Sequence, residues 1–142
     1  MLRKGVNILT LNDLINRVNS YAGASASLFT DSDKQDFINE AIDRTRKISE
    51  LRNMVHLTLS SQEPILLPKQ YHHLLSVYAV SRCYTQDEQS SLAQMFMNEF
   101  EAKLDELENG IKNGSIIIYD ENNFIVVSDD SIDNVKDVYF NS

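Results

Sequence analysis

Residues 71–84, YHHLLSVYAVSRCY, are the stretch that decides the fold of this 142-residue chain. Apolar residues fall on almost every side of a helix drawn through this stretch, namely Tyr71, Leu74, Leu75, Val77, Tyr78, Ala79, Val80, Cys83 and Tyr84. A helix that is apolar all round is a buried helix. The pattern therefore predicts a central helix, which Pro68 precedes at a position suited to a first helical turn.

Three further helices are predicted around the central one. The first covers residues 10–23, and the second covers about residues 32–53, where a Ser32 capping box competes with one at Thr30. The fourth begins at a capping box over residues 85–88 and has an apolar stripe that ends before Asn113-Gly114. The spacing of the apolar residues gives each helix one face for the bundle.

Two short β-hairpins are also predicted. Residues 55–59 alternate between apolar and polar side chains, and residues 65–67 can return as their partner strand. Near the C-terminus, β-branched runs at 115–119 and 124–128 flank the polar loop 120–123. The fold class is therefore mainly α: a four-helix bundle with a small inserted β-hairpin and a C-terminal β-hairpin and extended tail. We divide the chain into a helical domain, residues 1–114, and a C-terminal hairpin with an acidic tail, residues 115–142.

The net charge of −8 argues against a nucleic-acid-binding protein, because such proteins show a basic footprint. The last 28 residues carry Lys136 against Asp120, Glu121, Asp129, Asp130, Asp133 and Asp137. No apolar stretch approaches the roughly 20 residues that span a bilayer, and the N-terminus lacks the features of a signal peptide. We expect a protein made in the cytoplasm with no membrane contact, and a single, buried Cys83.

No catalytic or metal-binding pattern is present. His72 and His73 are neighbours on a helix and point in different directions, so they do not chelate a metal together. Asp129, Asp130 and Asp133 leave a hard-cation site open as an alternative to a solvated acidic tail. We therefore expect a protein that is not an enzyme, with no catalytic residues, no metal site and no cofactor.

Short motifs between residues 8 and 108 point to an assembly role. In chain order they are LTLNDLINRV, DFINEAIDRTRK, ILLPKQYHHLL, YAVSRCY and MFMNEFEAKLDEL, of which Ile38-Asn39-Glu40-Ala41 and Leu67-Pro68 are the most telling. This arrangement resembles the head-to-tail connector (adaptor, or head completion) proteins of tailed bacteriophages. Such proteins often stop soon after the long last helix, whereas this chain continues through residues 115–142.

The resemblance implies a structural virion protein of the neck, assembled in the host cytoplasm. It implies a homo-oligomeric ring, usually of twelve copies, that binds the portal protein and a tail or further neck protein. DNA would pass through the ring without sequence-specific binding. The alternative is an unrelated helical bundle that acts as a cytoplasmic protein-interaction or regulatory module.

Two sets of residues are candidates for contacts in such a ring. The first is an apolar joint to a neighbouring subunit or partner, made by Ile116, Ile118, Phe124 and Val126 of the hairpin and by Val138, Tyr139 and Phe140 of the tail. The alternative is that the hairpin folds back onto its own bundle. The second is a channel-facing acidic set, Glu99, Glu101, Asp105, Glu106 and Glu108, which can equally be an ordinary solvated face.

Overall fold

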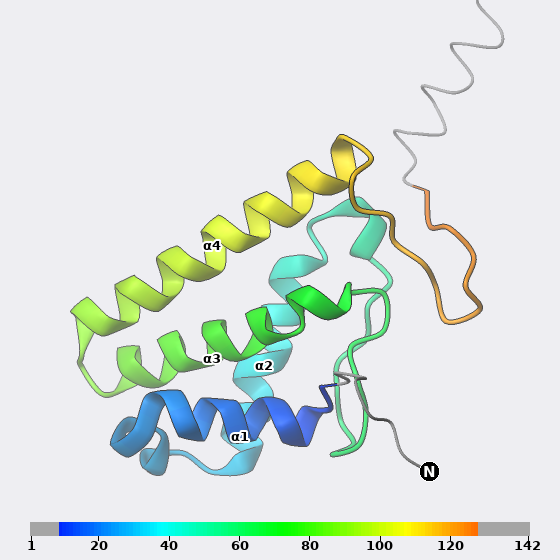
Figure 1. The fold of residues 1–142 in the computed structure, drawn as a ribbon. Coiled ribbons are helices and arrows are strands. Elements are labelled where there is room, and N and C mark those ends of the chain that lie inside the picture. The colour runs from blue at the N-terminus through cyan, green and yellow to red at the C-terminus, as the bar shows by residue number, and fades with distance from the viewer. Residues whose placement is uncertain (1–8, 128–142) are drawn as a thin grey trace, which may run out of the picture.

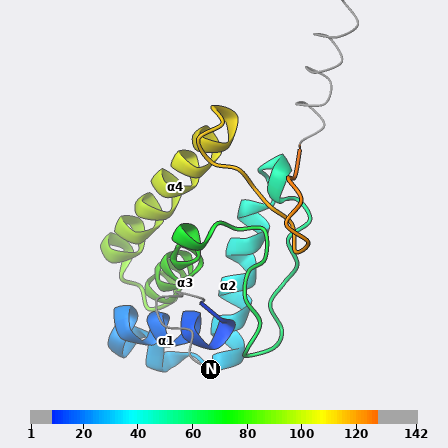
Figure 2. The same cartoon turned by 45° about the vertical axis from the view of Figure 1, so that its right-hand side comes forward.

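A computed structural model of the chain describes residues 9–127 and is mainly helical, as the sequence predicts. The helices are α1 (Leu11–Ala22), α2 (Asp31–Thr45), α3 (His73–Gln86) and α4 (Ser90–Lys112), with shorter 3-10 turns at Gly23–Leu28, Ser49–Leu51 and Lys69–Tyr71. Figure 1 shows α3 between α1 and α4, with α2 crossing behind them. Figure 2 shows the same order after rotation, with α2 now beside α3.

Helix α3 is the central helix, which confirms the prediction from its composition. It packs against α1, α2 and α4, and most of its residues are buried, including Cys83. Burial raises the pKa of the Cys83 thiol to about 11. Two buried serines of α3 are satisfied by neighbouring helices, because Ser76 Oγ donates to the Leu14 carbonyl and Ser81 Oγ to the Ala93 carbonyl.

The capping boxes at the starts of α1 and α2 form as reciprocal hydrogen bonds. In α1 the Asp13 N–H donates to Thr10 Oγ1 over 3.2 Å, and the Thr10 N–H donates to Asp13 Oδ2 over 3.0 Å. In α2 the same pair of bonds joins Thr30 and Asp33. Of the two competing boxes, the one at Thr30 is therefore used, and α2 starts one residue before Ser32.

Helix α2 ends earlier than its apolar stripe indicates. Its last residue is Thr45, whose hydroxyl donates to the Ile42 carbonyl. The stripe residues Ile48 and Leu51 are still buried, but a turn and a short 3-10 segment bring them to the core. The prediction of a helix to residue 53 is wrong, because apolar spacing survives when an α-helix gives way to 3-10 turns.

The predicted capping box of α4 over residues 85–88 does not form either. Thr85 belongs to α3, where its hydroxyl donates to the Ser81 carbonyl. Asp87 Oδ2 accepts hydrogen bonds from Ser25 Oγ at 2.7 Å and from Gln89 Nε2 at 3.0 Å. These bonds lower the pKa of Asp87 and tie the α3–α4 turn to the 3-10 turn after α1. Helix α4 starts at Ser90 without a side-chain cap.

Within residues 9–127 no β-strand is present, so the predicted hairpin over residues 55–67 is absent as a ladder. A side chain takes the place of the partner strand. The Leu57 N–H donates to Asn39 Oδ1 at 2.8 Å, and Asn39 Nδ2 donates to the Leu57 carbonyl at 3.0 Å. Leu57 is buried, whereas Val55 and Leu59 are exposed. The loop is also fixed to the start of α1, where the Leu11 N–H donates to the Gln62 carbonyl.

Candidate interaction surface

Residues 115–127 form a narrow looped segment, which we call the ribbon, after the end of α4. A single antiparallel bridge joins Tyr119 and Ile125. It is flanked by two backbone hydrogen bonds, from the Asp120 N–H to the Phe124 carbonyl and from the Val126 N–H to the Ile118 carbonyl, each of 2.9 Å. The predicted hairpin is thus reduced to one bridge. In Figure 1 the ribbon lies beyond the end of α4, beside the loop between α2 and α3.

Asp120 shapes the tip of the ribbon. Its Oδ1 atom accepts the backbone N–H groups of Asn122 and Phe124, each at 2.9 Å. Asn123 adopts a positive φ of 65°, which asparagine tolerates better than most residues. An aspartate followed by asparagines is a common turn combination for this reason, so the turn was correctly predicted where the strands were not.

One face of the ribbon packs on the chain's own bundle. Ile118 is only 2% exposed and belongs to the main core, while Ile116 and Val126 are partly buried against that core. Ile116 packs beside Gly110 of α4, where no side chain larger than hydrogen fits without a shift. Of the four predicted joint residues within residues 9–127, these three therefore meet their own bundle, as in the alternative left open, and Phe124 is exposed, at 69%.

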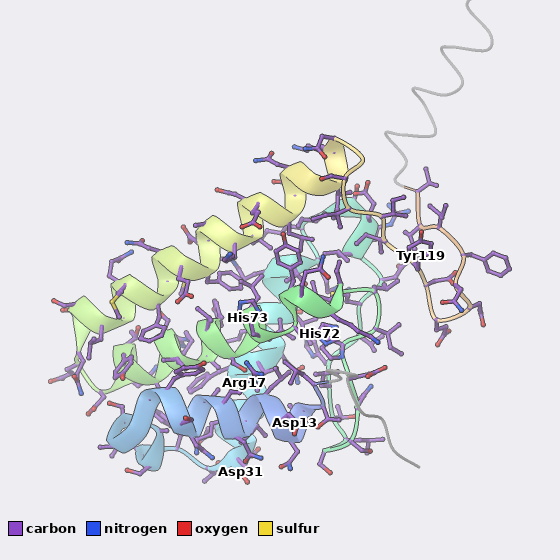
Figure 3. The ribbon with its side chains drawn as sticks, in the orientation of Figure 1. Asp13, Arg17, Asp31, His72, His73 and Tyr119 are labelled. Carbon is purple, nitrogen blue, oxygen red and sulfur yellow. The ribbon has the colours of Figure 1, made fainter. Side chains whose placement is uncertain are left out.

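The other face of the ribbon is apolar and exposed. Its residues are Ile117, Tyr119, Ile125 and Val127, which alternate with the packed ones. Figure 3 shows Tyr119 on the ribbon, to the side of the helices. Strands that read as continuous apolar runs are usually covered on both faces. The exposed face of this ribbon is therefore the strongest candidate for a protein contact in the described part of the chain.

Two grooves flank the ribbon. The first has a volume of about 430 Å³, and its apolar lining includes Val55, Ile65 and Ile125. The second, of about 420 Å³, runs between Ile117 and Tyr119 on one side and residues 66–70 on the other. Sequence reasoning missed Val55 and Ile65 because it assigned them to a self-contained hairpin. The one signal in the sequence was that both residues are β-branched and apolar.

Leu66 contributes to both grooves and has an unusual backbone. Its φ is +79°, a value that a branched residue rarely adopts without support. The next residue, Leu67, is fixed by a hydrogen bond. Its buried backbone carbonyl lies 2.7 Å from His72 Nε2. Since a carbonyl only accepts, Nε2 carries the hydrogen. Burial lowers the pKa of His72, and its Nδ1 has no hydrogen-bond partner among the described residues.

This arrangement predicts a pH dependence of stability that depends on His72. Because its folded-state pKa is depressed, the unfolded chain binds more protons at this site, so the contribution is complete above about pH 6.5 and is lost as the pH falls below it. Glu63, Lys69 and the carbonyls of Leu67 and Pro64 are the other groups that act on it. Urea unfolding at pH 7.5 and pH 5 should show a smaller loss in His72→Gln than in the native chain.

Glutamine suits this test because its Nε2 can still donate to the carbonyl without titrating. His73→Gln is the matched control, since His73 is the adjacent histidine and is only half-buried. The control should keep the full pH dependence. Equal pH dependence in the native chain and in His72→Gln would contradict the assignment.

The predicted acidic set on α4 does not form one stripe. Residues seven apart lie almost above one another on a helix, so Glu99 and Glu106 share one side, and Glu101, Asp105 and Glu108 share another. Glu101 faces α2, where Arg44 Nη2 approaches it to 3.1 Å. Glu106 accepts from the Tyr71 hydroxyl at 3.1 Å and pairs with Lys103.

The remaining members of the acidic set are exposed or only half-buried. Glu108 lies 3.8 Å from Lys112 in an i,i+4 pair. Asp105 is exposed and lies nearest the solvent side of α4. Exposed pairs of this kind contribute little to stability. The five carboxylates therefore lie along both edges of the exposed side of α4 rather than on a single face.

Glu40 of the motif at residues 38–41 joins α2 to α3. Its Oε1 accepts hydrogen bonds from the Tyr78 hydroxyl and from Arg82 Nε, each at 3.1 Å. Arg82 also lies over the Phe37 ring, 5.5 Å from its centroid. Burial and the Glu40 charge raise the pKa of Tyr78. With Asn39 holding Leu57, the two polar residues of this motif have packing roles, and their side chains are engaged.

The last three predicted joint residues, Val138, Tyr139 and Phe140, lie outside the described residues, as do Asp129, Asp130 and Asp133. Within residues 9–127, no group of three or more metal-binding side chains is close enough to hold an ion. The described helices include none that is long and apolar enough to cross a membrane. No protein-family model, curated protein or solved structure matches the chain.

Proposed function

We propose that this chain is a structural head-to-tail connector of a tailed bacteriophage virion, which forms a ring between the portal and the tail. The observation that carries the proposal is the exposed apolar face of the ribbon, which gives the bundle a surface for a neighbouring protein. The helical bundle around α3 agrees with the order of elements that the motifs imply. Asn39 of the motif at 38–41 and the Leu67 carbonyl of the motif at 67–68 both take part in hydrogen bonds that fix the loop beside the ribbon.

In this ring the ribbon is the joint, and Ile117 and Tyr119 are its contact residues. A neighbouring subunit that covers them meets the second groove, where Lys69 is exposed and has no ion pair within residues 9–127. A strand from that neighbour could pair with an edge of the ribbon, where the isolated chain forms only one bridge. Repeating a head-to-tail contact of this kind closes a ring when the rotation allows it. We propose twelve copies, seated on the portal and followed by tail or further neck proteins.

The exposed side of α4 faces the DNA channel in this proposal. Carboxylates lie along both edges of this side, and Asp105 is exposed. Their negative charge repels phosphates and so reduces binding to passing DNA. The protein would join the virion neck after synthesis in the host cytoplasm, as a non-enzymatic component.

A test of the joint uses substitutions on the exposed face. Ile117→Glu with Tyr119→Glu should leave the fold intact, since both residues are exposed, but should abolish co-sedimentation with the portal protein of the same phage. Leu28→Glu is the control, because Leu28 is also exposed but lies in the 3-10 turn after α1. Removing residues 115–142 would be a poorer test, since it also removes Ile118 from the core.

Normal co-sedimentation of the double variant would contradict the ribbon as the joint. The second candidate function, a protein-interaction or regulatory module, is favoured by the same exposed face, because one apolar patch can serve a monomer's partner or a two-fold dimer. Light scattering distinguishes the two by the mass of the particle. A dimer that does not bind the portal supports the module and contradicts the connector.

A further inference from the structure

The first groove has the properties of a site for an extended peptide. Its lining includes Val55, Ile65 and Ile125, which are 62%, 44% and 59% exposed, although all three are β-branched and apolar. The backbone N–H groups of Val55, Ile65 and Leu66 make no hydrogen bond within residues 9–127. An open apolar channel with free backbone donors accepts an added strand, which supplies carbonyls and alternate side chains.

The charge of the groove selects the kind of strand. Asp120 and Glu121 line it, and no lysine or arginine does. Asp120 uses Oδ1 to accept two backbone N–H groups, and Glu121 has no hydrogen bond or ion pair among the described residues. Two carboxylates with no cation among the described lining residues favour a basic, apolar segment. They disfavour the acidic residues 129–137 of this same chain, which would add like charge.

The chain carries such a segment in residues 2–8, Leu-Arg-Lys-Gly-Val-Asn-Ile, which lie outside the described residues. In an extended chain Leu2, Lys4, Val6 and Ile8 fall on one face. The groove is within reach: the Leu11 N–H is 2.7 Å from the Gln62 carbonyl, and Ile65 is three residues, at most about 10 Å, further along. A segment of this length spans up to roughly 25 Å.

We propose that residues 2–8 bind the first groove of the same chain as an added strand, with Lys4 facing Asp120 and Glu121. The segment would cover Ile125 and Val55 and hold the ribbon against the loop between α2 and α3. This contact does not depend on the ring, because the second groove, with Ile117 and Tyr119, stays open to a neighbour.

Disulfide trapping in the full chain tests the contact. Val6→Cys combined with Ile125→Cys should form an intrachain disulfide under mild oxidation, visible as a faster band on a non-reducing gel and as a linked peptide by mass spectrometry. Val6→Cys with Met95→Cys is the control, because Met95 is exposed on α4 and lies outside the groove. The native Cys83 is buried, with its pKa raised to about 11, and should not compete.

Trapping of the Val6–Ile125 pair at the rate of the control would overturn the proposal. A dimer-sized product would also contradict it, since it would assign residues 2–8 to the groove of another copy.

A charge exchange tests the choice of segment. Glu121→Lys in the Val6→Cys, Ile125→Cys background should slow trapping several-fold, and adding Lys4→Glu should restore the rate. Glu121 is exposed and at the ribbon tip, so the fold should not change. An unchanged rate in Glu121→Lys, or no recovery in the exchanged pair, would overturn the electrostatic assignment.

Discussion

Leu75→Ala should lower the free energy of unfolding by about 2–5 kcal/mol, the range for large-to-small changes in a packed core. Leu75 has no exposed surface, and it lies on α3, which contacts every other helix. The surrounding helices cannot all move toward one missing side chain, so a cavity should remain. Because a domain of this size is stable by only about 5–15 kcal/mol, the variant should unfold at a much lower urea concentration.

The control for this experiment is Met95→Ala. Met95 is also a large apolar residue in a helix, but it is exposed, and its removal should change stability by less than about 0.5 kcal/mol. Equal unfolding midpoints for Leu75→Ala and the native chain would remove α3 from the centre of the fold.

Asn39→Ala should be nearly as destabilising, although it removes a polar residue. Within the described residues, Asn39 is the only hydrogen-bond partner of the backbone N–H and carbonyl of the fully buried Leu57. Each buried polar group left without a partner costs about 1–3 kcal/mol. The loop over residues 52–58 should therefore loosen, which increased amide exchange at Leu57 would report.

Two further variants identify the amide as the cause. Asn39→Asp keeps an acceptor for the Leu57 N–H but loses the donor to its carbonyl, so it should not rescue stability at neutral pH. Asn16→Ala on the exposed side of α1 is the control and should change stability little. If Asn39→Ala unfolds at the native midpoint, the amide does not hold the loop.

Local chemistry made parts of the fold predictable. The capping boxes at Thr10 and Thr30 and the aspartate turn at Asp120 depend on residues a few positions apart, so the sequence contains both partners. The prediction of a buried α3 likewise needs only its own composition. Where a distant residue decides, the predictions were wrong. Ser25 donates a hydrogen bond to Asp87, which the sequence places in a capping box of α4 that does not form. Asn39 makes the hydrogen bonds to Leu57 that a partner strand was expected to make.

The candidate surface was predictable in position but not in orientation. A period of two divides the ribbon into two sets of side chains, but both sets are apolar, so hydrophobicity does not show which set faces the bundle. Gly110 decides it, because the absence of a side chain there admits Ile116. The grooves were not predictable, since Val55, Ile65 and Ile125 come together only through tertiary packing.

Negative-stain imaging of the full chain mixed with the portal protein of the same phage tests the central proposal most directly. The connector account predicts that the chain forms a ring on one end of the portal, coaxial with its channel, and that the Ile117→Glu, Tyr119→Glu variant leaves the portal bare. A portal that stays bare with the folded native chain in excess would contradict the account.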